Sequence, residues 1–165
     1  MKYGICVALG AVALGLMGCG SEEKKAPANT TPIGELIQAG KGPLVVSELR
    51  PSGNMVVAKF KVSVENVSDS HVDLMSGVAL YYDEKGAYIK DSKREMGYAE
   101  MGGIAPGEKI ELETMAGLEN ARKGKVILEK VVYKKDVGMQ GMGPIAMKWT
   151  NPKFAAEVAA AEGGQ

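Results

Sequence analysis

The sequence predicts an all-β protein, an antiparallel β-sandwich of immunoglobulin-like type with about seven strands and a short C-terminal helix. Apolar and polar residues alternate through several central segments, which is the period-two pattern of a half-buried strand. Turn residues separate these segments at short intervals, as they do in a sandwich. Strands do not alternate with helical segments, so nothing indicates a parallel sheet.

The first half of the central part contains three predicted strands. Residues 44–49 form the first strand, and residues 50–54 form a turn rich in Pro, Ser and Gly. Residues 56–65 form the clearest strand, because apolar residues occupy every second position. Gly77 predicts a β-bulge within the third strand. We expect one face of that strand to carry five apolar side chains, those of Val72, Leu74, Val78, Leu80 and Tyr82.

The second half contains turn signals and the remaining strands. Residues 83–86 form a tight hairpin connection that ends in glycine, and residues 95–101 form a further strand. Residues 105–108 read Ala-Pro-Gly-Glu, the pattern of a type II turn, because Pro suits its second position and Gly its third. The β-branched residues 125–135 form the last predicted strand. Two apolar side chains point inward from the strand after the turn: Ile110 and Leu112.

Two further segments flank the sandwich, which is predicted to cover residues 43–136. Residues 33–39 predict a helical turn, anchored by Leu36 and Ile37. Residues 137–165 predict a Gly- and Met-rich loop followed by a short helix. Asn151 is the expected N-cap of this helix, and Pro152 lies in its first turn. The apolar residues on one face of the helix are Phe154 and Val158.

Residues 1–18 have the features of a lipoprotein signal peptide. Lys2 provides a positive charge, and residues 3–17 form an apolar run shorter than the about 20 residues of a membrane-spanning helix. The run leads into a lipobox, Leu16-Met17-Gly18-Cys19. Cleavage before Cys19 makes this cysteine the lipidated N-terminus of the mature chain.

The lipobox predicts a protein anchored to a membrane outside the cytoplasm, because more than one acyl chain gives stable attachment. Residues 19–42 are then the lipidated cysteine and a flexible tether. Gly20 stands where an Asp would favour retention in the inner membrane, so we expect the outer membrane, facing the periplasm, if the source has two membranes. Cys6 is removed with the signal peptide, which leaves the mature chain without thiol chemistry or a disulfide.

Three motifs within residues 44–135 resemble those of small bacterial lipoprotein domains. They are Asn-Val-Ser-Asp at residues 66–69, Tyr-Asp-Glu-Lys-Gly at residues 82–86 and Pro-Gly-Glu at residues 106–108. They are similar to motifs of FxLYD-type domains and of the enteric small-lipoprotein family (DUF1425-like). The chain departs from the FxLYD spelling, since Ala79 replaces Phe and Tyr81 replaces Leu. Both resemblances imply an immunoglobulin-like sandwich, and neither brings a catalytic residue.

Composition and motifs argue against several classes of function. The 20 basic and 20 acidic residues balance, so the chain lacks the basic excess of nucleic-acid-binding proteins. His71 is the single histidine and lies between Asp69 and Asp73, but no nucleophile accompanies it, so we expect a solvated loop histidine. Glu111 and Glu113 are expected on a solvated outer face. We therefore expect a non-enzymatic protein without a cofactor.

The leading hypothesis is a membrane-tethered binding or assembly module whose partner is another envelope protein. The expected partner surface is a sheet edge or the tail that contains Trp149 and Phe154. The alternative is a Cu(I)-binding protein on the periplasmic side, because thioethers bind Cu(I) and the tail is rich in methionine. Methionine also fills gaps in ordinary structures, which favours the first hypothesis. The candidate copper ligands are Met139, Met142 and Met147.

Overall fold

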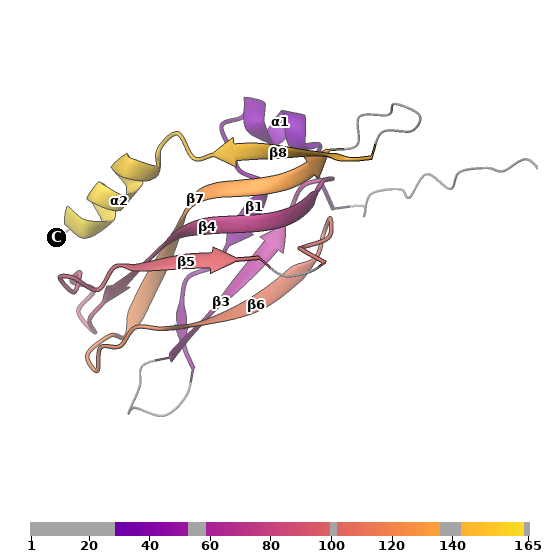
Figure 1. Cartoon of the computed structure of the whole chain (residues 1–165). Coiled ribbons are helices and arrows are strands. Elements are labelled where there is room, and N and C mark those ends of the chain that lie inside the picture. The colour runs from indigo at the N-terminus through magenta and orange to yellow at the C-terminus, as the bar shows by residue number, and fades with distance from the viewer. Residues whose placement is uncertain (1–28, 53–58, 100–101, 136–142, 164–165) are drawn as a thin grey trace, which may run out of the picture.

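Two antiparallel β-sheets face each other in the computed structural model, which describes residues 29–52, 59–99, 102–135 and 143–163 (Figure 1). The first sheet is built around β3 (Lys59–Asn66), which pairs with β1 (Leu44–Val46), β2 (Arg50–Pro51) and β6 (Lys109–Met115). The second sheet contains, in spatial order, β5 (Arg94–Tyr98), β4 (His71–Tyr82), β7 (Lys123–Lys135) and β8 (Ile145–Thr150). Two helices, α1 (Ile33–Gln38) and α2 (Phe154–Gly163), flank the sheets.

The hydrophobic core lies between the two sheets. β3 contributes Phe60, Val62 and Val64, which are all buried, while its lysines lie on the outer face. The ring of Tyr81 on β4 packs against that of Phe60 at a centroid distance of 5.1 Å. The hydroxyl of Tyr81 reaches across to the Thr114 hydroxyl on β6, at 3.1 Å. The predicted immunoglobulin-like sandwich is therefore confirmed, with eight strands in the described part of the chain.

The faces of β4 differ from the prediction, and the bulge expected within β4 at Gly77 lies on the partner strand β7 instead. The pairing of β4 with β7 shifts register twice, between Val72 and Leu74 and between Ser76 and Gly77. The first shift adds Asp73 to β4 and the second adds Glu129 to β7. The extra residue at Asp73 interrupts the alternation of side chains along β4, so the face predicted from period two alone is wrong. The β4 side chains in the main core are Val72, Met75, Ala79 and Tyr81. The opposite face presents Val78, Leu80 and Tyr82 to α2.

The segment before the sandwich is partly ordered against it. Thr31 forms a parallel bridge with Ser68, and the helical turn predicted at residues 33–39 is confirmed as α1. Its buried anchors are Ile33 and Leu36, whereas Ile37 is 40% exposed, so the prediction for Ile37 is wrong. Only the part of the predicted tether before this segment lies outside the described residues. The strand predicted at residues 44–49 is shorter, and β2 occupies part of the predicted turn after it.

The largest correction concerns residues 137–165, which were expected to contain only a loop and a helix. β8 pairs with β7 in antiparallel register, with Trp149 opposite Val131 and Met147 opposite Tyr133. The second sheet therefore extends to the end of β8, beyond the predicted boundary at residue 136. The C-terminal helix is confirmed as α2, and the Asn151 side chain accepts the Lys153 backbone N–H at 2.9 Å.

The two turns predicted at residues 83–86 and 105–108 are confirmed. Gly107 has φ +73°, and the Glu108 N–H donates to the Ala105 carbonyl at 3.0 Å, as a type II turn requires. Gly86 has φ +87° at the end of the hairpin connection. Ile110 and Leu112 pack against the core from β6. Within the described residues, no helix has the length and apolarity needed to cross a membrane.

Candidate functional site

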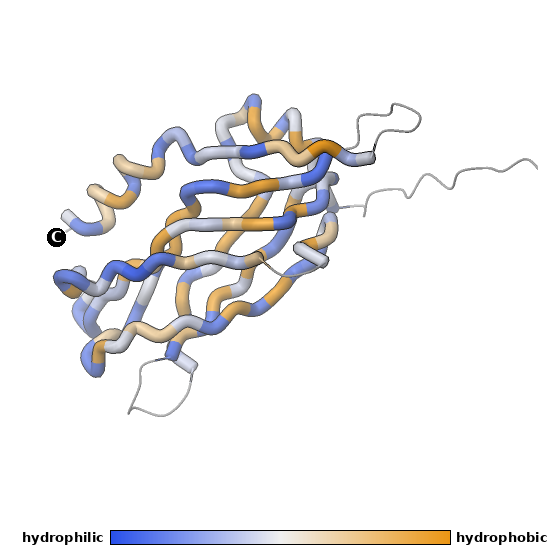
Figure 2. The backbone as a smooth tube through the Cα atoms, viewed as in Figure 1, coloured by the Kyte–Doolittle hydropathy of each residue, from blue (hydrophilic) through white to orange (hydrophobic). Residues whose placement is uncertain are grey.

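β8 is an edge strand with exposed apolar side chains. One edge of β8 pairs with β7, and no strand among the described residues pairs with the other edge. The side chains of Ile145 and Met147 are 46% and 43% exposed. Both lie on the same face as Trp149, since alternate residues of a strand share a face. Figure 2 shows hydrophobic residues at the beginning of β8. An unpaired edge with apolar side chains is a template for pairing with another strand.

Trp149 fixes this strand to the body of the protein. Its side chain is partly buried and packs against the main core. The indole ring lies over Gly42, where an added Cβ would come within 2.7 Å of a ring carbon. A glycine is therefore needed at residue 42 for this packing. Trp149 is predicted from the sequence to belong to the partner surface, and in the structure its ring makes an intramolecular contact.

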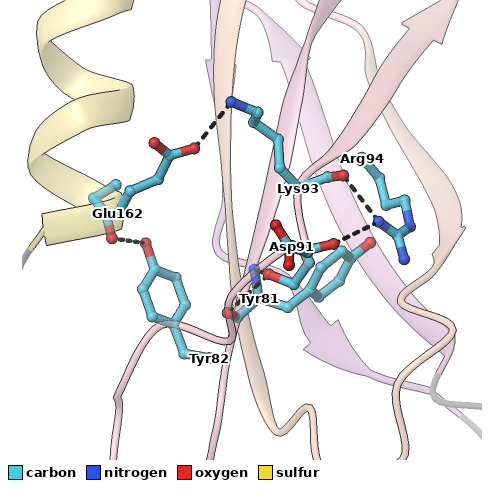
Figure 3. Close-up of polar contacts among 8 residues, drawn as sticks. Tyr81, Tyr82, Asp91, Lys93, Arg94 and Glu162 are labelled. Atoms are coloured by element: carbon cyan, nitrogen blue, oxygen red, sulfur yellow. Dashed lines mark hydrogen bonds and ion pairs between the residues drawn. The ribbon is translucent and has the colours of Figure 1, made fainter.

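α2 covers the outer face of the second sheet beside β8. Phe154 and Val158 pack with Leu80 and Ile127 in a second apolar cluster. Polar contacts at the other end of α2 join it to β4 and to the β4–β5 connection (Figure 3). The Tyr82 hydroxyl donates to the Ala161 carbonyl at 3.2 Å. Phe154, like Trp149, is therefore a packing residue that holds the C-terminal segment in place.

An ion pair completes this attachment. The Lys93 ammonium lies 3.0 Å from the Glu162 carboxylate (Figure 3). This hydrogen bond and the charge of Glu162 raise the pKa of Lys93. Burial, followed by the nearby Tyr88 and the charge of Glu162, raises the pKa of Tyr82. Folding therefore favours the protonated forms of Lys93 and Tyr82.

The opposite edge of the sandwich carries more charge than β8. A cleft of about 400 Å³ lies between β5 and β6, and Met96, Gly97 and Leu112 contribute to its lining. β5 begins with two charged residues, and β6 presents a lysine and two glutamates to solvent. Charged side chains protect a free edge against pairing. β8 has one charged residue, Lys148, and is the less protected edge.

Asp69 and Asp73 flank His71 in the sequence, but each of the three side chains has a different partner in the structure. The His71 imidazole contacts the Gly102 carbonyl. Asp73 pairs with Lys134 at 3.0 Å, and the Asp69 carboxylate accepts the Ile33 backbone N–H at 3.0 Å. Among the described residues, no three His, Cys, Asp or Glu side chains gather as metal ligands. The two glutamates expected on an outer face are exposed and pair with lysines of β3: Glu111 with Lys61 and Glu113 with Lys59.

The motifs that carry the family resemblance have structural roles here. The buried Asn66 amide donates to the Ser70 and Ile104 carbonyls, both at 2.9 Å. The Asp83 carboxylate accepts the Ala87 N–H at 2.9 Å across the hairpin. In the Pro-Gly-Glu turn, the Glu108 side chain accepts the Ala105 N–H at 2.7 Å. Each polar side chain satisfies backbone groups in a turn or loop.

Several predicted site residues lie outside the described part of the chain. They include the lipidation site Cys19 and two candidate copper ligands, Met139 and Met142. The third candidate ligand, Met147, is exposed on β8. Lipidation and copper binding therefore stay predictions.

Comparison with known proteins finds a distant similarity to a solved structure. No protein-family model and no curated protein sequence matches it. A DUF1425 family member from Shewanella sp. pv-4 is similar in structure, with a TM-score of 0.39 and 11% sequence identity. The similarity covers 52% of this chain and 76% of that chain. Nothing about activity or partners follows from it.

Proposed function

We propose that this protein is a membrane-tethered, non-enzymatic binding module of the cell envelope, which recognises a partner protein through the free edge of β8. The observation that carries the proposal is the exposure of Ile145 and Met147 on an edge strand with a single charge. A partner that supplies an extended segment would gain backbone hydrogen bonds from the edge and apolar contacts from these two side chains.

The position of β8 favours recognition without a large rearrangement. Trp149 packs β8 against the core, and the contacts of α2 anchor the segment that follows the strand. The free edge of β8 is therefore already extended before a partner binds. A preorganised surface binds more tightly because less conformational entropy is lost on association. This arrangement combines the two partner surfaces that the sequence suggested, a sheet edge and the tail with Trp149.

The lipobox at residues 16–19 supports the tethering part of the proposal. A lipid on Cys19 would confine the domain to the membrane surface and raise its local concentration near other envelope proteins. Such confinement allows a modest edge interface to act as an assembly contact. We expect an outer-membrane location facing the periplasm in a two-membrane cell, because Gly20 follows the lipidated cysteine.

In-cell photo-crosslinking from position 148 tests this function. We expect a probe in place of Lys148 to capture one recurrent envelope protein, and Cys19→Ala to abolish the capture. Met147→Lys introduces a charge beside the edge and should reduce capture about tenfold, the effect of a strong interface residue. The fold should be unaffected, since the side chain is already 43% exposed.

Met115→Lys is the matched control, because Met115 is 61% exposed and ends β6 in the other sheet. This variant should capture the partner as well as the unmodified chain does. Equal losses in both variants, or full capture by Met147→Lys, would show that β8 is not the recognition surface. Capture that survives Cys19→Ala would contradict the tethering part of the proposal.

A further inference from the structure

A small polar hollow lies on the outer face of the first sheet, away from β8. Its volume is about 160 Å³. β2, β3 and β6 provide its charged residues, and the segment after β1 adds a serine. The lining residues are Ser47, Arg50, Lys61, Ser63, Lys109 and Glu111. Three positive charges therefore face one negative charge in a space much smaller than the roughly 300–1,000 Å³ of sites for drug-sized ligands.

The positive charges of the hollow are incompletely compensated. Arg50 lies directly opposite Lys61 in the pairing of β2 with β3, and like charges in this position are destabilising. Lys61 pairs with Glu111 at 3.8 Å. Within the described chain, Arg50 and Lys109 have no ion-pair partner, although Glu65 is the register neighbour of Lys109. A bound anion would relieve this repulsion.

Two serine side chains add hydroxyl groups to the hollow. The Ser47 hydroxyl accepts the Ser63 backbone N–H at 2.9 Å and donates to the Glu48 carbonyl. The Ser63 hydroxyl oxygen is buried, and it has no hydrogen-bond partner among the described residues. A buried polar group without a partner is costly and calls for an explanation. A small ligand that accepts a hydrogen bond from the Ser63 hydroxyl would explain why this group has no partner within the described part of the protein.

We propose that this hollow binds a single phosphate group. Arg50 offers a planar fork of donors suited to two phosphate oxygens, and Lys109 offers a point charge from a different strand. A tetrahedral phosphate presents oxygens toward donors on β2, β3 and β6 at once, whereas the two oxygens of a carboxylate lie in one plane. The phosphate belongs either to a free ion or to a phospholipid headgroup. This site is independent of the proposed function of β8.

Phosphate titration followed by NMR tests the site. The probes are inorganic phosphate and glycerophosphoglycerol, the deacylated headgroup of phosphatidylglycerol. The full chain is kept in a maltoside detergent, which carries no phosphate, and chloride holds the ionic strength constant. We expect saturable shifts of the backbone amides of Lys61 and Ser63. Saturation by glycerophosphoglycerol alone identifies a lipid headgroup, and saturation by inorganic phosphate identifies a free ion. Saturation by neither overturns the proposal.

Charge variants distinguish a specific phosphate site from general electrostatic attraction of phosphate to the surface. Arg50→Gln and Lys109→Gln should each weaken binding about tenfold, because a charge-assisted hydrogen bond is lost. Lys125→Gln, an exposed lysine on the other sheet, should leave the affinity unchanged. Equal weakening by Lys125→Gln, or unchanged binding in Arg50→Gln, would overturn the site.

Ser63→Ala provides a readout that separates binding from folding. Because the hydroxyl has no partner in the described part of the chain, its removal should not lower the melting temperature. Phosphate affinity should nevertheless fall several-fold, since the ligand loses a donor. A variant that binds phosphate as tightly as the unmodified chain would contradict the proposed coordination by Ser63.

Discussion

Asn66 shows how this fold accommodates a buried polar residue. Its side chain is fully buried, and its amide nitrogen donates to two carbonyls. Its amide oxygen accepts the backbone N–H of Ser68 at 3.1 Å and the Ser68 hydroxyl at 2.7 Å. The amide thus uses both donors and both acceptor positions. This network joins the end of β3 to the loop that carries Ser70 and to the segment around Ile104.

Asn66→Asp should therefore be strongly destabilising. The substitution replaces two donors by an acceptor that faces the carbonyls of Ser70 and Ile104, and it buries a charge. We expect a loss of about 3 kcal/mol or more in the free energy of unfolding, measured by urea denaturation. Asn120→Asp makes the same chemical change at an exposed position and should alter stability by less than about 0.5 kcal/mol. Similar effects at both positions would refute the role of the network.

Gly77 is a second position at which a small change, the addition of a Cβ atom, should strongly destabilise the fold. A Cβ added there would lie 2.3 Å from the Ile127 carbonyl oxygen and 2.9 Å from the Leu128 Cα, both in the backbone of β7. Relief of this overlap requires the two central strands to separate, so Gly77→Ala should cost about 3 kcal/mol. Gly97→Ala on β5 is the control, because its nearest contact is an ordinary 3.8 Å. Denaturant midpoints measure both, and a stable Gly77→Ala protein would contradict this account.

At the scale of elements, the regular alternation of apolar residues is enough to predict β3, whereas the interrupted alternation of β4 leads to a wrong prediction of its buried face. Phe60, Val62 and Val64 follow one period without interruption and are buried as expected. The pairing of β4 with β7 contains two register shifts, one of which adds Asp73 to β4, and sequence alternation alone cannot place them. β8 was missed although Ile145, Met147 and Trp149 alternate with other residues, because the neighbouring Gly- and Met-rich composition indicated a loop.

The attachment of α2 should weaken at alkaline pH. Lys93 and Tyr82 contact the end of α2, and the pKa of each is raised above its ordinary value of 10.5 and 10.0 respectively. Each group therefore keeps its proton to higher pH in the folded than in the unfolded protein. The stability that both confer is complete below about pH 10 and is lost as the pH rises through their folded pKa values.

Melting temperatures between pH 8 and pH 11.5, a range chosen to span roughly the ordinary lysine and tyrosine pKa values, measure this effect. We expect Lys93→Gln and Tyr82→Phe to flatten the alkaline decline seen in the unmodified protein. Lys90→Gln, at an exposed position of the same connection, should retain the full decline. A decline of equal steepness in all four proteins would show that other groups cause the alkaline loss.

At the scale of the whole molecule, the two faces of the sandwich have different characters. α2 covers part of the outer face of the second sheet, so β4 is buried on both sides near its C-terminal end. The outer face of the first sheet is open and carries ion pairs and the polar hollow. The sequence predicts that Glu111 and Glu113 lie on this open face. It could not predict the convergence of Arg50, Lys61 and Lys109, because strand register brings them together.

The integration of the C-terminal segment changes what its deletion should do. A sandwich complete at residue 136 would tolerate loss of residues 137–165. Instead, this deletion removes β8 from the edge of β7 and uncovers the core around Val131. It also removes α2 from Leu80 and Ile127. We expect the deletion to remove most of the net stability, which is only about 5–15 kcal/mol for a typical domain.

Thermal unfolding followed by circular dichroism tests this expectation. Deletion of residues 137–165 should abolish the cooperative transition. Deletion of residues 151–165 alone keeps β8 paired and Trp149 on Gly42, so it should lower the melting temperature but leave a cooperative transition. If the longer deletion melted at the temperature of the unmodified chain, the domain would end at residue 136 and β8 would be an appendage. If the shorter deletion also unfolded the protein, α2 would be essential to the core.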